Sequence, residues 1–149
     1  MQYTQQEQAI ISQAIAIIEA KTINGESIAN PQQTKELLRL RMAPLGHEVF
    51  TIVFLSTQHT VIAIEEMFRG TIDAASVYPR EVAKRCLELG ASAVILAHNH
   101  PSGSTQESQA DIQITRRLQS ALELLDIRVL DHIIVSTSGA GSFAERGLL

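Results

Sequence analysis

The stretch that most constrains the fold is residues 91–111, where a short apolar run ends abruptly at two histidines. Residues 93–97 are rich in small and β-branched side chains and are followed by polar residues and a Pro-x-Gly turn, which is typical of a buried central strand. Side chains alternate along a strand, so His98 and His100 leave its end on one face while Asn99 points to the other. The stretch therefore directs two imidazoles to one point.

The chain after this turn is expected to form a helix that carries more polar groups to the same point. Ser104, with Glu107 three residues later, predicts a capping box that starts the helix. Ser108 and Asp111 are also three residues apart and therefore share one face of its first turns. Two imidazoles, a hydroxyl and a carboxylate are thus expected around one site.

Two neutral imidazoles and one carboxylate are a ligand set that suits Zn²⁺, and three protein ligands leave one tetrahedral position open. An open position is typical of a catalytic site, so we predict a zinc site formed by His98, His100 and Asp111. Ordinary core or surface histidines are the alternative, which the H-x-H pair followed by S-x-x-D disfavours. The tripeptide HNH is only weak support for an HNH nuclease, because the ββα context of that site is not evident here. A zinc deaminase needs a Cys-x-x-Cys pair, whereas Cys86 is the only cysteine of this chain.

The spacing of His98, His100, Ser108 and Asp111 resembles the JAMM (Jab/MPN) metalloprotease motif. The segments HNHPSG, TRRL, DHIIV and SFAERGLL resemble the bacterial RadC family, specifically its short single-domain branch, and this resemblance covers residues 30–149. It implies a cytidine-deaminase-like JAMM/MPN fold and a metal-dependent hydrolase, without indicating the substrate. Longer RadC-like proteins add an N-terminal helix-hairpin-helix region, for which we expect no room in this chain.

Hydrolysis by activated water also needs a carboxylate that collects a proton and passes it to the leaving amine. The candidates are Glu48, Glu65, Glu66 and Glu107. The resemblance implies Glu48, which stands directly after a helix at the start of an apolar strand; a solvated strand-end glutamate is the alternative. Glu65 and Glu66 are adjacent, so only one can face inward, and Glu107 is expected to cap a helix.

The expected mechanism is that of a zinc metallopeptidase or isopeptidase acting on a peptide or protein. Glu48 deprotonates a water on Zn²⁺, the hydroxide attacks an amide carbonyl, and Ser108 donates to the developing oxyanion. For Ser108, a backbone hydrogen bond in the first turn of the helix is equally expected. Two other functions stay open: a nucleic-acid-associated protein, as the RadC name suggests, and a non-hydrolytic metal-binding module with a toxin-antitoxin or mobile-element role.

Composition places the chain among ordinary soluble proteins. Its 149 residues, 45% hydrophobic and 19% charged, are enough for one domain with a sizeable core. A lone cysteine indicates a reducing compartment, and there is neither an export signal nor an apolar run of the ~18 residues that a membrane span needs. We therefore expect a cytoplasmic protein that does not enter the membrane.

The predicted elements alternate between helix and strand. Residues 1–29 are expected to form an N-terminal helix, begun by a capping box of Thr4 and Glu7, and a loop ahead of a domain at residues 30–149. The apolar face of this helix is expected to pack on the domain core, with a homodimer contact as the alternative. A loop over residues 21–30 is expected to end at Asn30, the N-cap of a helix at 31–42 that buries Leu37, Leu38 and Met42. A helix at 79–90 carries the apolar residues Val82, Ala83, Cys86 and Leu87 and ends at Gly90, and the core stripe of a helix at 111–125 is Ile114, Leu118, Ala121, Leu122 and Leu125. A hairpin is predicted at 47–55 and 60–68, and strands at 93–97 and 128–135, before a terminal segment at 142–149. This order predicts a three-layer α/β domain with a mixed sheet.

The other histidines carry weaker predictions. Strand alternation sends the side chain of His47 away from Glu48, and His59 is a turn residue. Asp131 and His132 could orient a metal ligand, but the sequence alone favours an ordinary pair at the start of a strand. The basic residues on the helices before and after the site are expected to form a solvated face: Arg80, Lys84, Arg85, Arg116 and Arg117.

We predict that this chain binds DNA only weakly. Affinity for duplex DNA comes mainly from clustered Lys and Arg, and the chain has 12 such residues against 16 acidic ones. Its aromatic content of 4% offers few stacking platforms for single strands. Fluorescence anisotropy with duplex, single-stranded and branched DNA across a salt series should give dissociation constants no tighter than about 10⁻⁴ to 10⁻⁶ M. Nanomolar binding with a steep salt dependence would favour the nucleic-acid function instead.

Overall fold

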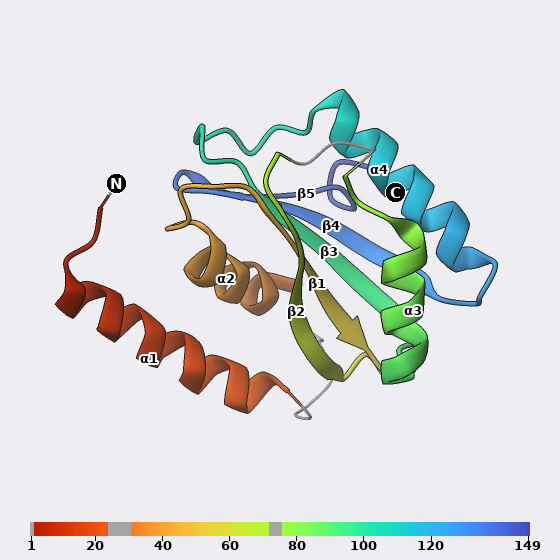
Figure 1. The fold of residues 1–149 in the computed structure, drawn as a ribbon, viewed down its shortest axis with the longest axis horizontal. Helices are drawn as coiled ribbons and strands as arrows, with labels where there is room; N and C mark the ends of the chain where they lie inside the picture. The colour runs from red at the N-terminus through yellow and green to blue at the C-terminus, as the bar shows by residue number, and fades with distance from the viewer. Residues whose placement is uncertain (1, 24–30, 72–75) are drawn as a thin grey trace.

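A five-stranded sheet of order β2-β1-β3-β4-β5 runs through the middle of the computed structural model, which describes residues 2–23, 31–71 and 76–149. The strands are β1 (Val49–Leu55), β2 (Val61–Arg69), β3 (Ala93–Asn99), β4 (Arg128–Ser136) and β5 (Gly139–Ser142). The helices in the described residues are α1 (Gln5–Thr22), α2 (Pro31–Met42), α3 (Pro79–Leu89) and α4 (Gln109–Glu123). β3 and β4 are parallel, the other neighbours are antiparallel, and helices cover both faces (Figure 1). The predicted three-layer α/β domain with a mixed sheet is confirmed.

The face of the sheet that α3 and α4 cover holds the larger core. All seven residues of β1 are buried, so the strand contributes one set of side chains to each face. The residues that form this core include Phe50, Ile52, Phe54, Val82, Cys86, Ile114, Leu118 and Leu122. The predicted core positions Leu87 and Leu125 are wrong, because their exposed fractions are 62% and 42%. Leu87 lies on the outer side of α3, and Leu125 follows the end of α4.

α2 covers the opposite face of the sheet. Its predicted core residues Leu37, Leu38 and Met42 are buried and pack with Val53 and Leu55 of β1. The left-handed Gly90, with φ of 66°, ends α3 as the sequence predicts. Of the predicted loop at residues 21–30, residues 21 and 22 belong to α1 instead, and residues 24–30 with the N-cap Asn30 lie outside the described residues.

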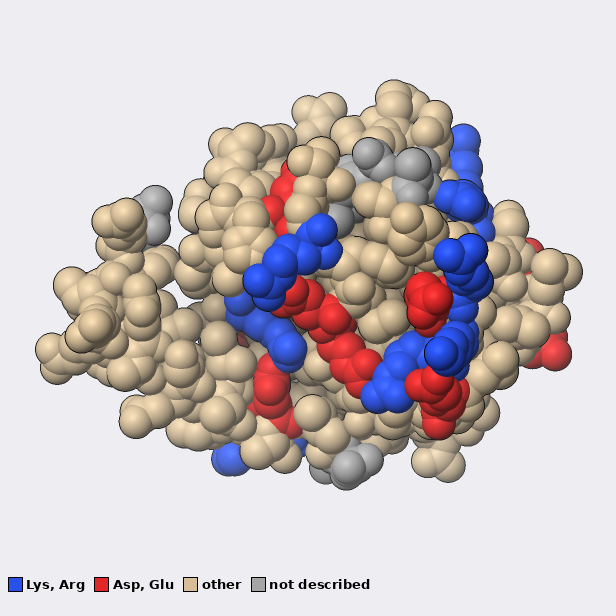
Figure 2. All heavy atoms as spheres, in the orientation of Figure 1, with Lys and Arg blue, Asp and Glu red and all other residues tan. Residues whose placement is uncertain are grey.

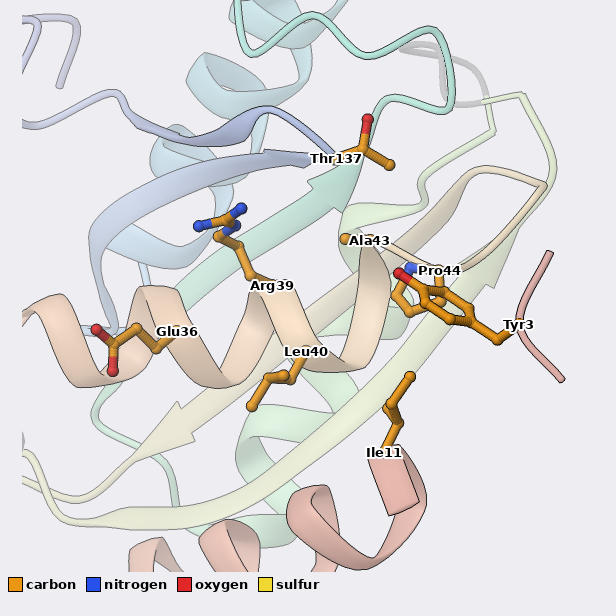
Figure 3. Close-up of a pocket in the computed structure, with 8 residues that line it drawn as sticks. All are labelled: Tyr3, Ile11, Glu36, Arg39, Leu40, Ala43, Pro44 and Thr137. Carbon is orange, nitrogen blue, oxygen red and sulfur yellow. The ribbon is translucent and has the colours of Figure 1, made fainter. Parts of the chain in front are cut away.

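α1 lies on the outside of α2 and is begun by the predicted capping box of Thr4 and Glu7. It has no buried residue: only Ile18 contacts the core on this side, and Ile10 and Ile17 expose 59% and 60% of their surface. A hollow of about 440 Å³ lies at this junction, none of the predicted site residues lines it, and Figure 3 shows the residues that do. Its lining residues are Tyr3, Ile11, Glu36, Arg39, Leu40, Ala43, Pro44 and Thr137. The predicted packing of α1 on the domain is therefore shallow.

β5 is a strand that the sequence pattern did not predict. It pairs with β4 as an antiparallel hairpin, with Ile133 opposite Ser142 and Val135 opposite Ala140. Its residues GAGS have low strand propensity, so the turn and the neighbouring strand determine its conformation. None of the helices in the described part of the chain is both long enough and apolar enough to cross a lipid bilayer.

The packing of α3 predicts that Cys86 does not react in the folded protein. The side chain is fully buried, and burial raises the pKa of the thiol to about 11. A charged thiol reagent at mildly alkaline pH should therefore leave the native chain unlabelled and should label one thiol per chain in denaturant. Rapid stoichiometric labelling of the native protein would contradict this packing of α3.

Candidate metal centre

The three predicted metal ligands meet where β3 ends and α4 begins. His98 Nε2 lies 2.8 Å from His100 Nε2 and 3.1 Å from Asp111 Oδ1, and His100 Nε2 lies 3.2 Å from Asp111 Oδ2. His98 and Asp111 are buried, and His100 is partly exposed. Ligands about 2.1 Å from a tetrahedral Zn²⁺ lie roughly 3.4 Å from one another. The observed separations are near this value, so the three side chains fit a metal ion with little movement.

Strand pairing positions the first ligand. His98 lies near the end of β3, all of whose residues are buried, and is opposite Phe50 of β1. The two rings are stacked, with centroids 6.3 Å apart and planes 9° from parallel. Alternation then places His100 beside His98, as the sequence predicts. The Phe50 ring therefore packs against one face of the His98 ring and limits its orientation.

A capping box positions the carboxylate ligand. The Ser108 amide donates to Asp111 Oδ2 at 2.7 Å, and the Asp111 amide donates to Ser108 Oγ at 3.1 Å. The predicted helix start at Ser104 is wrong, since Ser104 Oγ accepts from the Gln106 amide in a turn and the Glu107 carboxylate pairs with Arg146. Both serines precede an acidic residue by three positions, so the local pattern is ambiguous. The tertiary contact of Glu107 leaves Ser108 as the cap.

The tautomer of His100 follows from its second ring nitrogen. His100 Nδ1 lies 3.1 Å from the carbonyl oxygen of Ser104, which can only accept a hydrogen bond. The hydrogen-bond network therefore assigns the proton of a neutral His100 to Nδ1, and Nε2 presents a lone pair to Asp111 and His98. A lone pair that faces a buried carboxylate is the arrangement that a cation stabilises.

The charges at the site favour an ionised Asp111. Burial raises the pKa of this carboxyl, but the adjacent His100 and His98 outweigh burial and hold the pKa well below its ordinary value, because a proton on either Nε2 would be donated to the carboxylate. The pKa of His100 is raised, chiefly by its hydrogen bond to Asp111, and the charge of Glu48 adds to this effect. Glu48 therefore lies close enough to His100 to act on it electrostatically.

The backbone around Glu48 is held on both sides by Asn99, the residue between the two histidines. Asn99 Oδ1 accepts from the Val49 amide at 2.7 Å, and Asn99 Nδ2 donates to the His47 carbonyl at 2.8 Å. The Gly70 amide also donates to the Glu48 carbonyl at 2.9 Å. We did not predict this role of Asn99, although a buried amide needs partners for its oxygen and nitrogen.

Arginines engage the other three candidate bases. Glu65 forms two 2.7 Å bonds with Arg85, whose hydrogen bond lowers the pKa of Glu65. Glu66 lies 2.8 Å from Arg69, and Glu107 pairs with Arg146 instead of capping a helix. A carboxylate beside an arginine is a weak base. Of the four candidates, Glu48 is the one whose charge acts on His100.

The structure separates the predicted pair of Asp131 and His132. His132 is not an ordinary residue at the start of a strand: its Nε2 lies 2.8 Å from Nδ1 of His98, and its Nδ1 lies 2.6 Å from Thr115 Oγ1. Burial holds the pKa of His132 well below its ordinary value. Asp131 points elsewhere, and its Oδ2 accepts from Ser142 Oγ at 2.6 Å. One residue of the pair therefore contacts a metal ligand and the other holds the C-terminal segment.

None of the remaining sequence candidates belongs to the cluster of His98, His100 and Asp111. His47 is exposed, and His59 occupies the turn between β1 and β2 with a φ of 59°. Arg85 is neutralised by Glu65 and Glu88. Figure 2 shows Lys and Arg side chains interleaved with Asp and Glu on the displayed face, as expected for a solvated surface.

Comparison with known proteins gives a consistent family. Residues 28–148 match a family model described as RadC-like JAB domain. A UPF0758 protein of Vibrio cholerae is 52% identical over 143 residues, which cover 96% of this chain and 90% of that protein. UPF0758 proteins of Methylibium petroleiphilum and Nitrosococcus oceani are 57% and 53% identical, and the matched regions cover 54% and 65% of their lengths. These names state no activity.

We predict that the purified protein carries about one zinc per chain, because three protein ligands converge on one point. Elemental analysis of protein purified without added metal should find this zinc in the wild type and little in His98→Ala. His59→Asn is the matched control, since it removes a histidine from the turn and asparagine tolerates a positive φ. Equal zinc content in the wild type and His98→Ala would contradict the prediction that His98 is a metal ligand.

Proposed function

The chain belongs to the RadC-like JAB domain family, and from this premise we propose that it is a zinc-dependent peptidase or isopeptidase of the JAMM type. Membership of the family agrees with the resemblance of HNHPSG and SFAERGLL, and the five-stranded mixed sheet is consistent with a JAB/MPN-like fold. One observation carries the proposal: His98, His100 and Asp111 converge on one point, and the charge of Glu48 reaches the same point.

His98, His100 and Asp111 would hold the metal ion through two imidazole nitrogens and one carboxylate. When bound, Zn²⁺ supplies Lewis-acid activation of water and of the scissile carbonyl. The capping box keeps Asp111 in place, and the stacked Phe50 keeps the His98 ring in place. The ligands are therefore held before any metal arrives, which lowers the cost of binding it.

Glu48 would move the proton. Its carboxylate oxygen would accept a proton from the attacking water and deliver it to the nitrogen of the leaving amine. Asn99 and Gly70 hold the backbone around Glu48 beside the end of β3, and the charge of Glu48 acts on His100. This position supports the role that the family resemblance implies for Glu48.

Ser108 can combine the two roles expected from the sequence. Its Oγ accepts the Asp111 amide as an N-cap, and a hydroxyl that accepts one hydrogen bond still has a proton to donate. That proton would be directed to the developing oxyanion of the substrate. The cap would thus hold a donor beside the metal site.

The test is the variant Glu48→Gln, which keeps the shape of the side chain but cannot accept a proton. A substrate is first selected with zinc-loaded wild type from a library of peptides and isopeptides. Glu48→Gln should then keep its metal while hydrolysis falls by about 10²- to 10⁴-fold. Glu66→Gln is the matched control, because Glu66 is an exposed glutamate paired with Arg69.

Full activity in Glu48→Gln would mean that another residue is the general base. If the zinc-loaded wild type cleaves no member of the library, the hydrolase proposal fails, and a metal-binding module without hydrolytic activity replaces it.

A further inference from the structure

A buried chain of hydrogen bonds runs from the first metal ligand into α4. It passes from His98 Nδ1 to His132 Nε2 at 2.8 Å, and from His132 Nδ1 to Thr115 Oγ1 at 2.6 Å. It ends at the backbone carbonyl of Asp111, 2.7 Å from Thr115 Oγ1. The exposed fractions of these four residues are 2% or less. Because this chain is closed to solvent, each of its protons has to be used within it.

The Asp111 carbonyl at the end of this series of hydrogen bonds determines which atom donates in each of them. A carbonyl can only accept, and a threonine hydroxyl has one proton, so Thr115 donates to Asp111. Thr115 Oγ1 must then accept the hydrogen of His132 Nδ1. In the reverse direction, two oxygens would face each other at 2.7 Å with no proton between them. A neutral His132 with its proton on Nδ1 has a lone pair on Nε2, so Nδ1 of His98 donates to it.

These donors determine the state of Nε2, the other ring nitrogen of His98. A neutral His98 with its proton on Nδ1 presents a lone pair at Nε2, which faces Asp111 and His100. Only an unprotonated ring nitrogen can bind a metal ion. We propose that Thr115 and His132 are positioning residues that fix His98 in the tautomer whose Nε2 binds the metal. This inference rests on the metal centre of the proposed function.

The surroundings of His132 support a neutral ring. Phe143 stacks on it with centroids 4.7 Å apart, and Phe50 lies at 5.6 Å with its ring tilted 67°. Apolar contacts of this kind disfavour an imidazolium, which would carry hydrogens on both nitrogens and turn His98 Nδ1 into an acceptor. Asp111 takes part at both ends, since its carboxylate faces His98 Nε2 and its carbonyl accepts the last bond.

The first measurement needs no variant. In metal-free wild type with ¹⁵N-labelled histidine, two-bond ¹H–¹⁵N correlation spectra should show His98 and His132 protonated on Nδ1 and unprotonated on Nε2. A proton on Nε2 of His98 in the folded wild type would overturn the proposal.

The second measurement uses a pair of variants at one position. Thr115→Val keeps the shape of the side chain but removes the hydroxyl, so His132 should move its proton to Nε2 and shift the His98 proton to its metal-facing nitrogen. Zinc affinity, measured by competition with a chelator, should fall about tenfold or more, as is usual when a group behind a metal ligand is lost. Thr115→Ser restores the hydroxyl and should recover the affinity of the wild type.

Ile114→Val is the matched control, since it trims the buried neighbour of Thr115 on the same helix and leaves the chain of hydrogen bonds intact. It should leave zinc affinity unchanged. Unchanged affinity in folded Thr115→Val, or an equal loss in Ile114→Val, would overturn the proposal. Neither measurement uses a substrate, so failure to find hydrolysis defeats the proposed function and leaves this inference standing. If metal-free wild type carries the His98 proton on Nε2 and the protein still binds zinc and hydrolyses a substrate, this inference fails and the proposed function stands.

Discussion

Burying the carboxylate of Asp111 costs free energy that positive charge and hydrogen bonds must offset, and much of this fold supplies that compensation. The Ser108 amide donates to it at the N-terminus of α4, where the helix dipole favours an anion. The nearest side-chain nitrogens belong to His98 and His100, and each has its other ring nitrogen held by a second contact. Since both imidazoles present lone pairs when neutral, the carboxylate is fully compensated only when a cation joins them. A proton on His100 can take this place, which explains why the pKa of His100 is raised.

The order of the strands explains how residues far apart in the sequence serve this carboxylate. β3 is central: its antiparallel neighbour β1 begins beside the end of β3 and brings Glu48 there, and its parallel neighbour β4 brings His132. The connection between the two parallel strands contains α4, whose first turn carries Asp111. Parallel strands need such a crossover, so the crossover helix α4 also supplies the third ligand. This order of elements brings Glu48, His132 and Asp111 to the end of β3 that carries His98.

Local patterns predicted the parts of the site that depend on one strand end and one helix turn. The convergence of His98, His100 and Asp111 follows from alternation and helical spacing, and the structure brings these residues together. The contact between His132 and His98 could not be predicted in this way, because it depends on the register between β3 and β4. The same limit explains the error at Ser104 and Glu107, where an arginine distant in the sequence decided between two similar capping patterns. β5 was missed since its short side chains carry no periodic signal.

The tripeptide at the end of β3 uses both faces of the sheet. Its two histidines face α4 and Asp111, while Asn99 faces the chain that enters β1 and holds the backbone around Glu48. Side chains alternate with a period of two, so a slip of one residue in the pairing of β3 would turn both imidazoles away from Asp111. It would also withdraw the amide from His47 and Val49. The ligands and the proposed base therefore depend on one strand register, which Phe50 secures through its pairing with His98 and its place in the core.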